Sequence, residues 1–327
     1  MEATPFLYST LHPDLRYEIL GHLNAEELNV MAQAGCRVAP KELLLRFTAL
    51  LVRFSLDPKD FRACMMTHGA VVSGSAALAV ILPRPSSFVP NDIDIYVNSS
   101  GLSGLLKYIL TRTPYTKETV LTRARGPDVA YSVLVGGTAM LTVRLLEDPL
   151  SGRSLNVVEA STRSPLSVVW GFHSTLVMNV VLHSGVGSAY PRHALEGVGV
   201  INCVRGRMVR RPALVQALDK YRRRGFRLYA NLVDVFASQD RAVTSTPALS
   251  QHHCGTWAYC PQTTRDSLDP GMLWVPFPGY TSDDMLQGVP SVSWKLAHDG
   301  ECCRELAPCP GWLEDVDGRR ASIVTGF

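Results

Sequence analysis

A strand that runs into a Gly-Ser turn and then a helix is the feature that most restricts the fold of this chain. Residues 70–72 are Ala-Val-Val, the turn follows at residues 73–75, and the apolar run over residues 76–81 predicts a helix. Backbone N–H groups at a helix start can bind phosphate oxygens where no bulky side chain blocks the approach. Gly74 and Ser75 are therefore candidate nucleotide-binding residues.

Two acidic residues lie on the next predicted strand. Residues 91–97 alternate polar and apolar side chains, so Asp92 and Asp94 share one face while Ile93 and Ile95 share the other. A pair of carboxylates on one strand is typical of sites that hold Mg²⁺ against a triphosphate. The spacing predicts Asp92 and Asp94 as catalytic residues and as ligands of Mg²⁺.

The composition allows a buried core and excludes general disorder, because 46% of the 327 residues are hydrophobic. A formal net charge of +3 is too small a bias to support a nucleic-acid partner. Residues 1–10 carry no secretory signal, and the most apolar window, residues 69–82, is too short for a membrane span. With eight cysteines, this pattern favours reduced thiols, so we expect a cytoplasmic or nuclear protein without membrane contact.

We expect an α/β fold of the α+β type in three regions. Residues 1–60 predict a small helical unit, in which an Asn-x-x-Glu box at Asn24 caps a helix. Residues 61–236 predict a mixed sheet with flanking helices, including a hairpin around the turn at residues 148–152. Residues 237–327 are rich in Ser, Thr, Pro, Trp and Cys with little periodicity, which predicts an irregular C-terminal extension.

The Gly-Ser turn and the acidic strand together resemble a known signature. Ser75 is followed sixteen residues later by Asn91, which begins the sequence Asn-Asp-Ile-Asp-Ile. A turn and a strand in this order resemble the nucleotidyltransferase (polymerase-beta-like) superfamily. The resemblance implies that a nucleoside triphosphate and Mg²⁺ bind at Gly74, Ser75, Asp92 and Asp94, and that a nucleotidyl group is transferred to a hydroxyl or phosphate acceptor.

A narrower resemblance is to a group of basidiomycete fungal proteins in which an F-box-like N-terminus precedes such a domain. The helix predicted from Pro13 looks like the start of an F-box, with an apolar stripe formed by Leu15, Ile19, Leu20 and Leu23. Three later stretches of this chain, residues 155–159, 172–175 and 220–226, look like later sequence blocks of that group. The likeness covers residues 10–310 and implies that residues 10–35 bind a ubiquitin-ligase adaptor.

Two departures from the superfamily pattern bear on activity. Active members carry a third carboxylate on a neighbouring strand, where this chain offers Asn156, a neutral residue that binds a divalent cation more weakly. His173 stands where the pattern has an acidic residue. Asn156 is still a candidate nucleotide-binding residue, as are Lys220 and Arg224, whose basic cluster could grip a triphosphate. Cations in a last helical turn also complement the helix dipole, which explains the cluster without a ligand.

Two functions of different classes are therefore open. The first is a nucleotidyltransferase-fold protein that binds a nucleoside triphosphate with Mg²⁺ and transfers a nucleotidyl group if it is active. The second is a catalytically degenerate interaction protein, an F-box-like substrate adaptor of a ubiquitin ligase, which the loss of the third carboxylate at Asn156 favours. A purely structural α/β domain is the third alternative.

A repeated cysteine spacing in the C-terminal region suggests a metal site. The pattern Cys-x5-Cys-Pro occurs twice, and its four thiols could bind a structural Zn²⁺ at Cys254, Cys260, Cys303 and Cys309. Buried cysteines that pack as small hydrophobic residues are the alternative.

Overall fold

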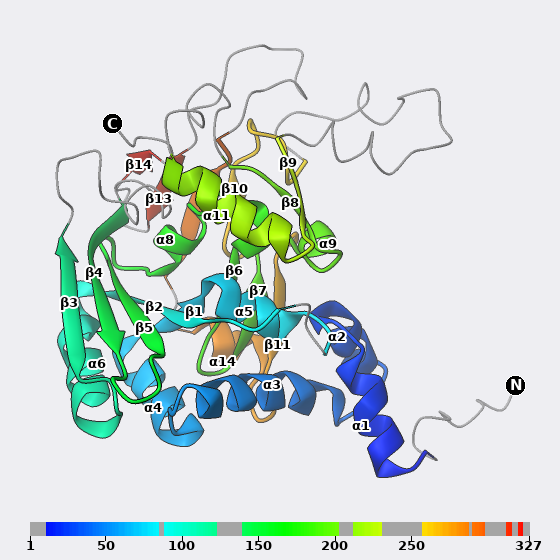
Figure 1. Ribbon diagram of the computed structural model, residues 1–327. Helices are drawn as coiled ribbons and strands as arrows, with labels where there is room; N and C mark the ends of the chain where they lie inside the picture. Colours follow the sequence, from blue (N-terminus) through cyan, green and yellow to red (C-terminus); the bar gives the residue numbers. More distant parts are fainter. Residues whose placement is uncertain are drawn as a thin grey trace, which may run out of the picture.

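The structure is a computed structural model that describes residues 11–84, 88–122, 139–202, 212–230, 257–287, 290–297, 312–315 and 320–322. The fold is mixed α/β: a large mixed sheet carries helices on its faces, as Figure 1 shows. This confirms the expected fold class at the level of α and β content.

The sheet has eight strands in the order β11-β7-β6-β1-β2-β5-β4-β3. Only β2 and β5 pair in parallel among these neighbours, and the other pairs are antiparallel. The expected hairpin is β4 and β5, joined by a turn in which Asp148 accepts a hydrogen bond from the Leu150 N–H. The strands are β1 (Val71–Ser73), β2 (Asp92–Asn98), β3 (Lys117–Thr122), β4 (Met140–Glu147), β5 (Ser154–Ala160), β6 (Asn179–Val181), β7 (Gly185–Ser188) and β11 (Leu273–Pro276).

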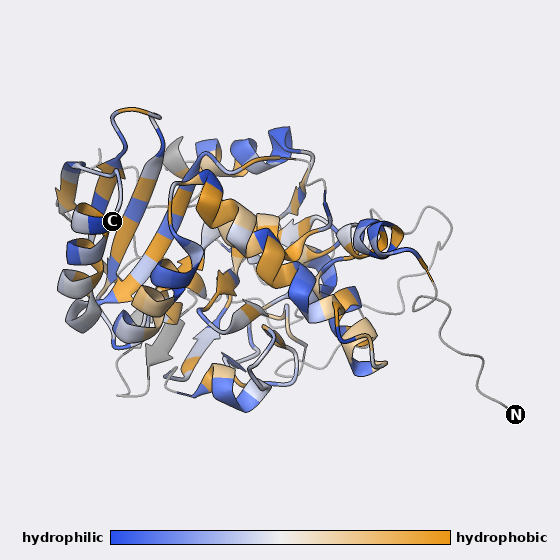
Figure 2. Ribbon diagram, turned by 90° about the horizontal axis from the view of Figure 1, so that it is seen from below, coloured by the Kyte–Doolittle hydropathy of each residue, from blue (hydrophilic) through white to orange (hydrophobic). Residues whose placement is uncertain are grey.

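Side chains alternate between the two faces of this sheet. Figure 2 shows that the long strands change between hydrophilic and hydrophobic residues along their length. In β4, the buried positions include Met140, Val143 and Leu146, while Leu141 between them is exposed. Val143 and Leu146 are three positions apart and point to opposite faces, so both faces of β4 contribute buried side chains.

Four helices precede the sheet: α1 (Pro13–Gly21), α2 (Ala25–Gln33), α3 (Ala39–Arg53) and α4 (Pro58–His68). The predicted cap of α2 is confirmed, because Asn24 Oδ1 accepts the N–H of Glu27 at 3.0 Å and Glu27 Oε2 accepts the N–H of Asn24 at 2.7 Å. The expected apolar stripe of α1 is only partly buried. Leu20 is 4% exposed, whereas Leu15 is 56% exposed and Ile19 is 39% exposed.

These helices share one hydrophobic core with the sheet. Phe47 of α3 stacks on Phe277, the residue after β11, with ring centroids 6.2 Å apart. A buried arginine adds polar contacts: Arg46 donates to the carbonyls of Leu20, Leu23 and Leu82 at 3.0, 2.8 and 2.6 Å. Its Nε pairs with Glu42 Oε1 at 2.8 Å. Arg46 thus ties α1 and the end of α5 to α3.

The remaining elements follow or interleave with the sheet. The helices are α5 (Gly74–Ile81), α6 (Ser99–Arg112), α8 (Leu166–Val169), η3 (Thr175–Val177), α9 (Pro191–Ala194), α11 (Pro212–Arg223) and α14 (Ser282–Leu286). A parallel pair is formed by β8 (Val198–Val200) and β9 (Arg227–Tyr229). A four-stranded sheet is formed by β10 (Arg265–Asp266), β12 (Val292–Lys295), β13 (Trp312–Asp315) and β14 (Arg320–Ser322).

The C-terminal extension is therefore more regular than its sequence predicted. In its described part, β11 adds to the edge of the main sheet by pairing with β7, and β10, β12, β13 and β14 form the second sheet. Trp294 of β12 packs on Trp170 with ring centroids 5.4 Å apart, and both side chains are fully buried. The expectation of an irregular extension was wrong because these strands are too short to show a periodicity of their own.

Candidate functional site

The backbone brings the predicted turn and the predicted acidic strand together. β1 ends at Ser73, and α5 begins at Gly74. The antiparallel register of β1 and β2 places Ser73 opposite Asp94, and the parallel register of β2 and β5 places Asp94 opposite Asn156. Gly74, Asp94 and Asn156 therefore come from three adjacent elements at one end of the strands.

Asn156 binds both aspartates. Its Nδ2 lies 2.8 Å from Asp94 Oδ1 and 3.3 Å from Asp92 Oδ2. Ionised carboxylates only accept hydrogen bonds, so the amide nitrogen faces them and its oxygen faces away. The amide is 5% exposed and its two N–H donors offset part of the repulsion between two neighbouring negative charges. Asn156 thus acts as a donor between the aspartates rather than as a metal ligand.

The Gly74 position admits no side chain. Its φ is +65°, a conformation that L-residues avoid, and a Cβ there would lie 2.5 Å from Asp94 Oδ2. Ser75 is 1% exposed, and its Oγ has no hydrogen-bond partner among the residues that the structure describes. The same holds for Asp92 Oδ1 within the described part of the chain. A ligand that reached this turn could satisfy such buried polar atoms.

Tyr221 of α11 lies close to the two aspartates, and sequence reasoning missed it. The side chain is buried, and its pKa is raised by burial first and then by the negative charges of Asp94 and Asp92. The pKa of Tyr96 is raised for the same reasons, with burial again the largest cause. Both hydroxyls therefore stay protonated at neutral pH. A tyrosine on the apolar face of a helix gives no sequence signal that separates this role from core packing.

Lys220 and Arg224 both lie near the Tyr221 ring. The Lys220 Nζ is 5.8 Å from the Tyr221 ring centroid, and the Arg224 guanidinium lies 4.4 Å from the Phe88 ring centroid and 5.6 Å from that of Tyr221. The His173 ring lies 6.0 Å from the Tyr221 ring. Tyr221 is therefore influenced by the positive charge of Arg224 as well as by the negative charges of the two aspartates.

The cofactor prediction is wrong for the residues that the structure describes. No group of three or more His, Cys, Asp or Glu side chains there could hold a metal ion. Asp92 and Asp94 form only a pair, and the third position is filled by a donor amide, which explains why the expected Mg²⁺ site is incomplete. Of the four cysteines expected to bind Zn²⁺, only Cys260 is described, and it is buried with its Sγ accepting the Gln262 N–H at 3.4 Å. The other three, Cys254, Cys303 and Cys309, lie outside the described residues.

No protein-family model, curated protein or solved structure matches this chain. Within the described ranges, none of the helices is both long enough and apolar enough to cross a bilayer. A proposal for function therefore depends on the chemistry of the residues around Gly74 and Asn156.

Proposed function

We propose that this chain is a nucleotidyltransferase-like protein that binds a nucleoside triphosphate but does not transfer the nucleotidyl group. The observation that carries the proposal is the Asn156 amide between the carboxylates of Asp92 and Asp94. Nucleotidyl transfer needs divalent ions that neutralise the developing charge and activate the attacking oxygen. A neutral amide that donates hydrogen bonds to the two carboxylates cannot replace the missing acidic ligand.

The start of α5 supports the binding part of this proposal. Ser73, the residue before the helix, makes no capping hydrogen bond with its own side chain, and the N–H groups of a first helical turn can bind phosphate oxygens. The buried Ser75 Oγ supplies a further donor, and Gly74 leaves room for the phosphate. Lys220 and Arg224, around Tyr221, add positive charge nearby. Together these groups favour an anionic ligand with several oxygens.

The binding proposal is tested by replacing Gly74 with alanine. Calorimetric titration with each of the four ribonucleoside triphosphates, in Mg²⁺ and in EDTA, should show binding to the wild type. Gly74→Ala should weaken it by about tenfold or more, because the new Cβ collides with Asp94 and fills the approach to the turn. The same variant should lose about 1 kcal/mol or more of stability from its positive φ.

Gly152→Ala is the matched control for this test. Gly152 has a similar φ of +67° in the β4–β5 turn, and a Cβ there would meet no atom within 4 Å. This variant should carry the same backbone strain and bind nucleotide like the wild type. The proposal fails if the wild type binds none of the four nucleotides in either buffer, or if Gly74→Ala binds as tightly as Gly152→Ala.

The N-terminal helices favour a second function, as an adaptor subunit of a ubiquitin ligase. Several apolar side chains of α1 and α2 are partly exposed to solvent: Leu15 is 56%, Tyr17 47%, Ile19 39% and Val30 58% exposed. Leu15 and Ile19 are four residues apart on α1 and so share one helix face, and exposed apolar patches mark protein interaction surfaces. These residues lie within residues 10–35, the range that the F-box-like resemblance implies for binding a ubiquitin-ligase adaptor.

Replacing Leu15 and Ile19 together by aspartate tests this second function. The double variant should fold, since both side chains are exposed, and should lose about 2 kcal/mol or more of binding energy toward a purified ubiquitin-ligase adaptor. Leu150→Asp, at a turn residue that is 94% exposed, should bind like the wild type. Surface plasmon resonance with immobilised adaptor would measure the difference in affinity. If the wild type does not bind the adaptor, this second function is ruled out.

A further inference from the structure

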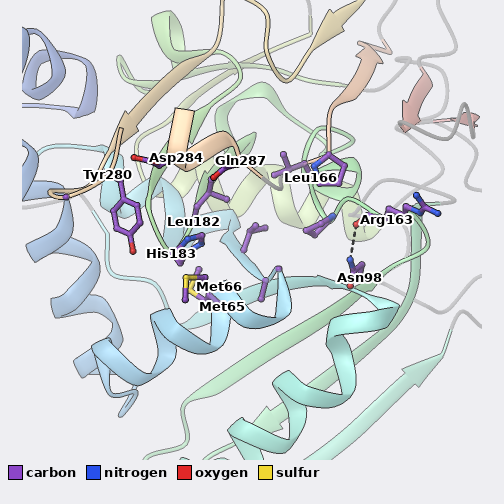
Figure 3. Close-up of a pocket in the computed structure, with 16 residues that line it drawn as sticks. Met65, Met66, Asn98, Arg163, Leu166, Leu182, His183, Tyr280, Asp284 and Gln287 are labelled. Carbon is purple, nitrogen blue, oxygen red and sulfur yellow. Dashed lines mark hydrogen bonds between the residues drawn. The ribbon is translucent and has the colours of Figure 1, made fainter. Parts of the chain in front are cut away.

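A cavity of about 590 Å³ opens at the opposite end of β1 and β2 from the nucleotide site. It is lined by Val71 at the start of β1 and by Asn98 at the end of β2, whereas Gly74 and Asp92 lie at the other ends of these strands. Figure 3 shows the side chains around it. Its lining combines apolar side chains, such as Met66 of α4 and Leu182, with polar ones, such as Asn98 and Gln287.

A second cavity of about 380 Å³ adjoins the first one. The two share Met66, His183 and Tyr280, so they form one groove that passes over these three side chains. We call it the Met66 groove. His183 and Tyr280 pack edge to face with ring centroids 5.8 Å apart, and Met66 is 56% exposed. The three shared side chains therefore lie between the two cavities and line both of them.

The charges around the Met66 groove are mainly positive. Lys59 and Arg62 line the smaller cavity, and Arg163 lines the larger one. Arg62 is held in place by its Nε, which donates to the His183 carbonyl at 2.8 Å. Asp284 is the acidic residue that lines these cavities among the described residues, and its carboxylate already accepts the Thr281 N–H at 2.8 Å in the cap of α14. Lys59 and Arg62 therefore attract negative charge on a ligand at the smaller cavity, whereas at the larger cavity the charge of Asp284 offsets that of Arg163.

The shape and the side chains of the groove suit an extended chain. Successive side chains on one face of an extended peptide are about 7 Å apart, so one peptide can place apolar side chains in two adjoining depressions. Methionines are flexible and accommodate apolar groups of different shape. His183 stays neutral at neutral pH, because burial and the nearby Arg62 lower its pKa, so it offers hydrogen bonds rather than charge.

We propose that the Met66 groove binds an extended segment of a partner protein that carries apolar side chains flanked by Asp or Glu. The apolar side chains enter the two cavities on either side of Met66, His183 and Tyr280. The acidic residues face Lys59 and Arg62 at the smaller cavity. This site is separate from the nucleotide site and does not depend on it.

The test uses two pools of fluorescein-labelled octapeptides with randomised apolar and serine residues at their central positions. One pool is flanked by glutamates and the other by lysines. Fluorescence anisotropy of the full chain should show binding of the glutamate pool and little binding of the lysine pool. Met66→Glu should weaken binding of the glutamate pool on the order of tenfold, because it adds a negative charge at the centre of the groove.

Leu150→Glu is the matched control, since it adds the same charge at a residue that is 94% exposed and lies outside both cavities. Both variants should bind nucleotide like the wild type, which separates this proposal from the nucleotide site. Equal binding of the two pools, binding by neither, or unchanged binding by Met66→Glu would overturn the proposal. A second result would also overturn it: the wild type enhances the fluorescence of anilinonaphthalene sulfonate, Met66→Glu does not, and neither peptide pool binds. The groove would then hold a small amphipathic molecule rather than a peptide.

Discussion

Replacing Asn156 with aspartate is expected to lower the free energy of unfolding by about 2–4 kcal/mol in metal-free buffer at pH 8. The substitution removes the amide donors that lie 2.8 and 3.3 Å from the carboxylates of Asp94 and Asp92. In their place it adds a third negative charge in a buried position. The same change completes a set of three carboxylates, which is the ligand type that Mg²⁺ prefers. Millimolar Mg²⁺ should therefore restore much of the lost stability.

Urea denaturation in EDTA and in Mg²⁺ measures this effect, with Asn202→Asp as the control. Asn202 is also a buried asparagine, but its Nδ2 donates to the carbonyl of Phe172 at 2.9 Å rather than to carboxylates. Asn202→Asp should lose stability and should not regain it in Mg²⁺. If Asn156→Asp gains no more from Mg²⁺ than this control, the three side chains do not form a common site.

Replacing Arg46 with methionine should destabilise the protein by about 3–5 kcal/mol. Arg46 is 5% exposed and Glu42 is 1% exposed, so the substitution leaves a buried carboxylate without the more buried of its two arginine partners. The carbonyls of Leu20 and Leu82 also lose their donors. Arg84, whose Nε lies 2.7 Å from Glu42 Oε1, compensates for only part of the charge.

Thermal and urea unfolding would measure this loss against Arg53→Met, a change at an exposed arginine of the same helix. The control should differ from the wild type by less than about 0.5 kcal/mol. Adding Glu42→Gln to Arg46→Met should recover part of the loss, because the unpaired charge is removed. A stability of Arg46→Met close to that of Arg53→Met would mean that Arg46 does not connect α1 and α5 to α3.

The parts of the fold that sequence predicted are those set by neighbouring residues. The cap at Asn24 follows from a side chain that reaches only three residues along the chain. The alternation of β2 over residues 92–95 and the direct passage from a strand to a helix are equally local, although α5 begins at Gly74 and so includes the two residues expected in a turn. The positions of Gly74, Asp92 and Asp94 could therefore be predicted before any sheet order was known.

The parts that sequence did not predict depend on contacts between distant segments. β11 pairs with β7, with Leu273 opposite Ser188, and no local pattern in the C-terminal region indicates that partner. The charges of Asp94 and Asp92 act on Tyr221 of α11, a helix far away in the sequence, and a helical periodicity cannot show this proximity. The hydrogen bonds of Asn156 to both carboxylates likewise required the parallel register of β2 and β5.

The most direct test of the central claim is a phosphorus NMR experiment on an equimolar mixture of the four ribonucleoside triphosphates with stoichiometric wild-type protein in Mg²⁺. The account predicts that the phosphate resonances of at least one nucleotide shift or broaden, because phosphate oxygens bind at Gly74 and Ser75. It also predicts that no pyrophosphate resonance develops, because Asn156 holds the carboxylates of Asp92 and Asp94. Unchanged spectra would contradict nucleotide binding, and growth of a pyrophosphate resonance that Asp92→Ala abolishes would contradict the loss of transfer.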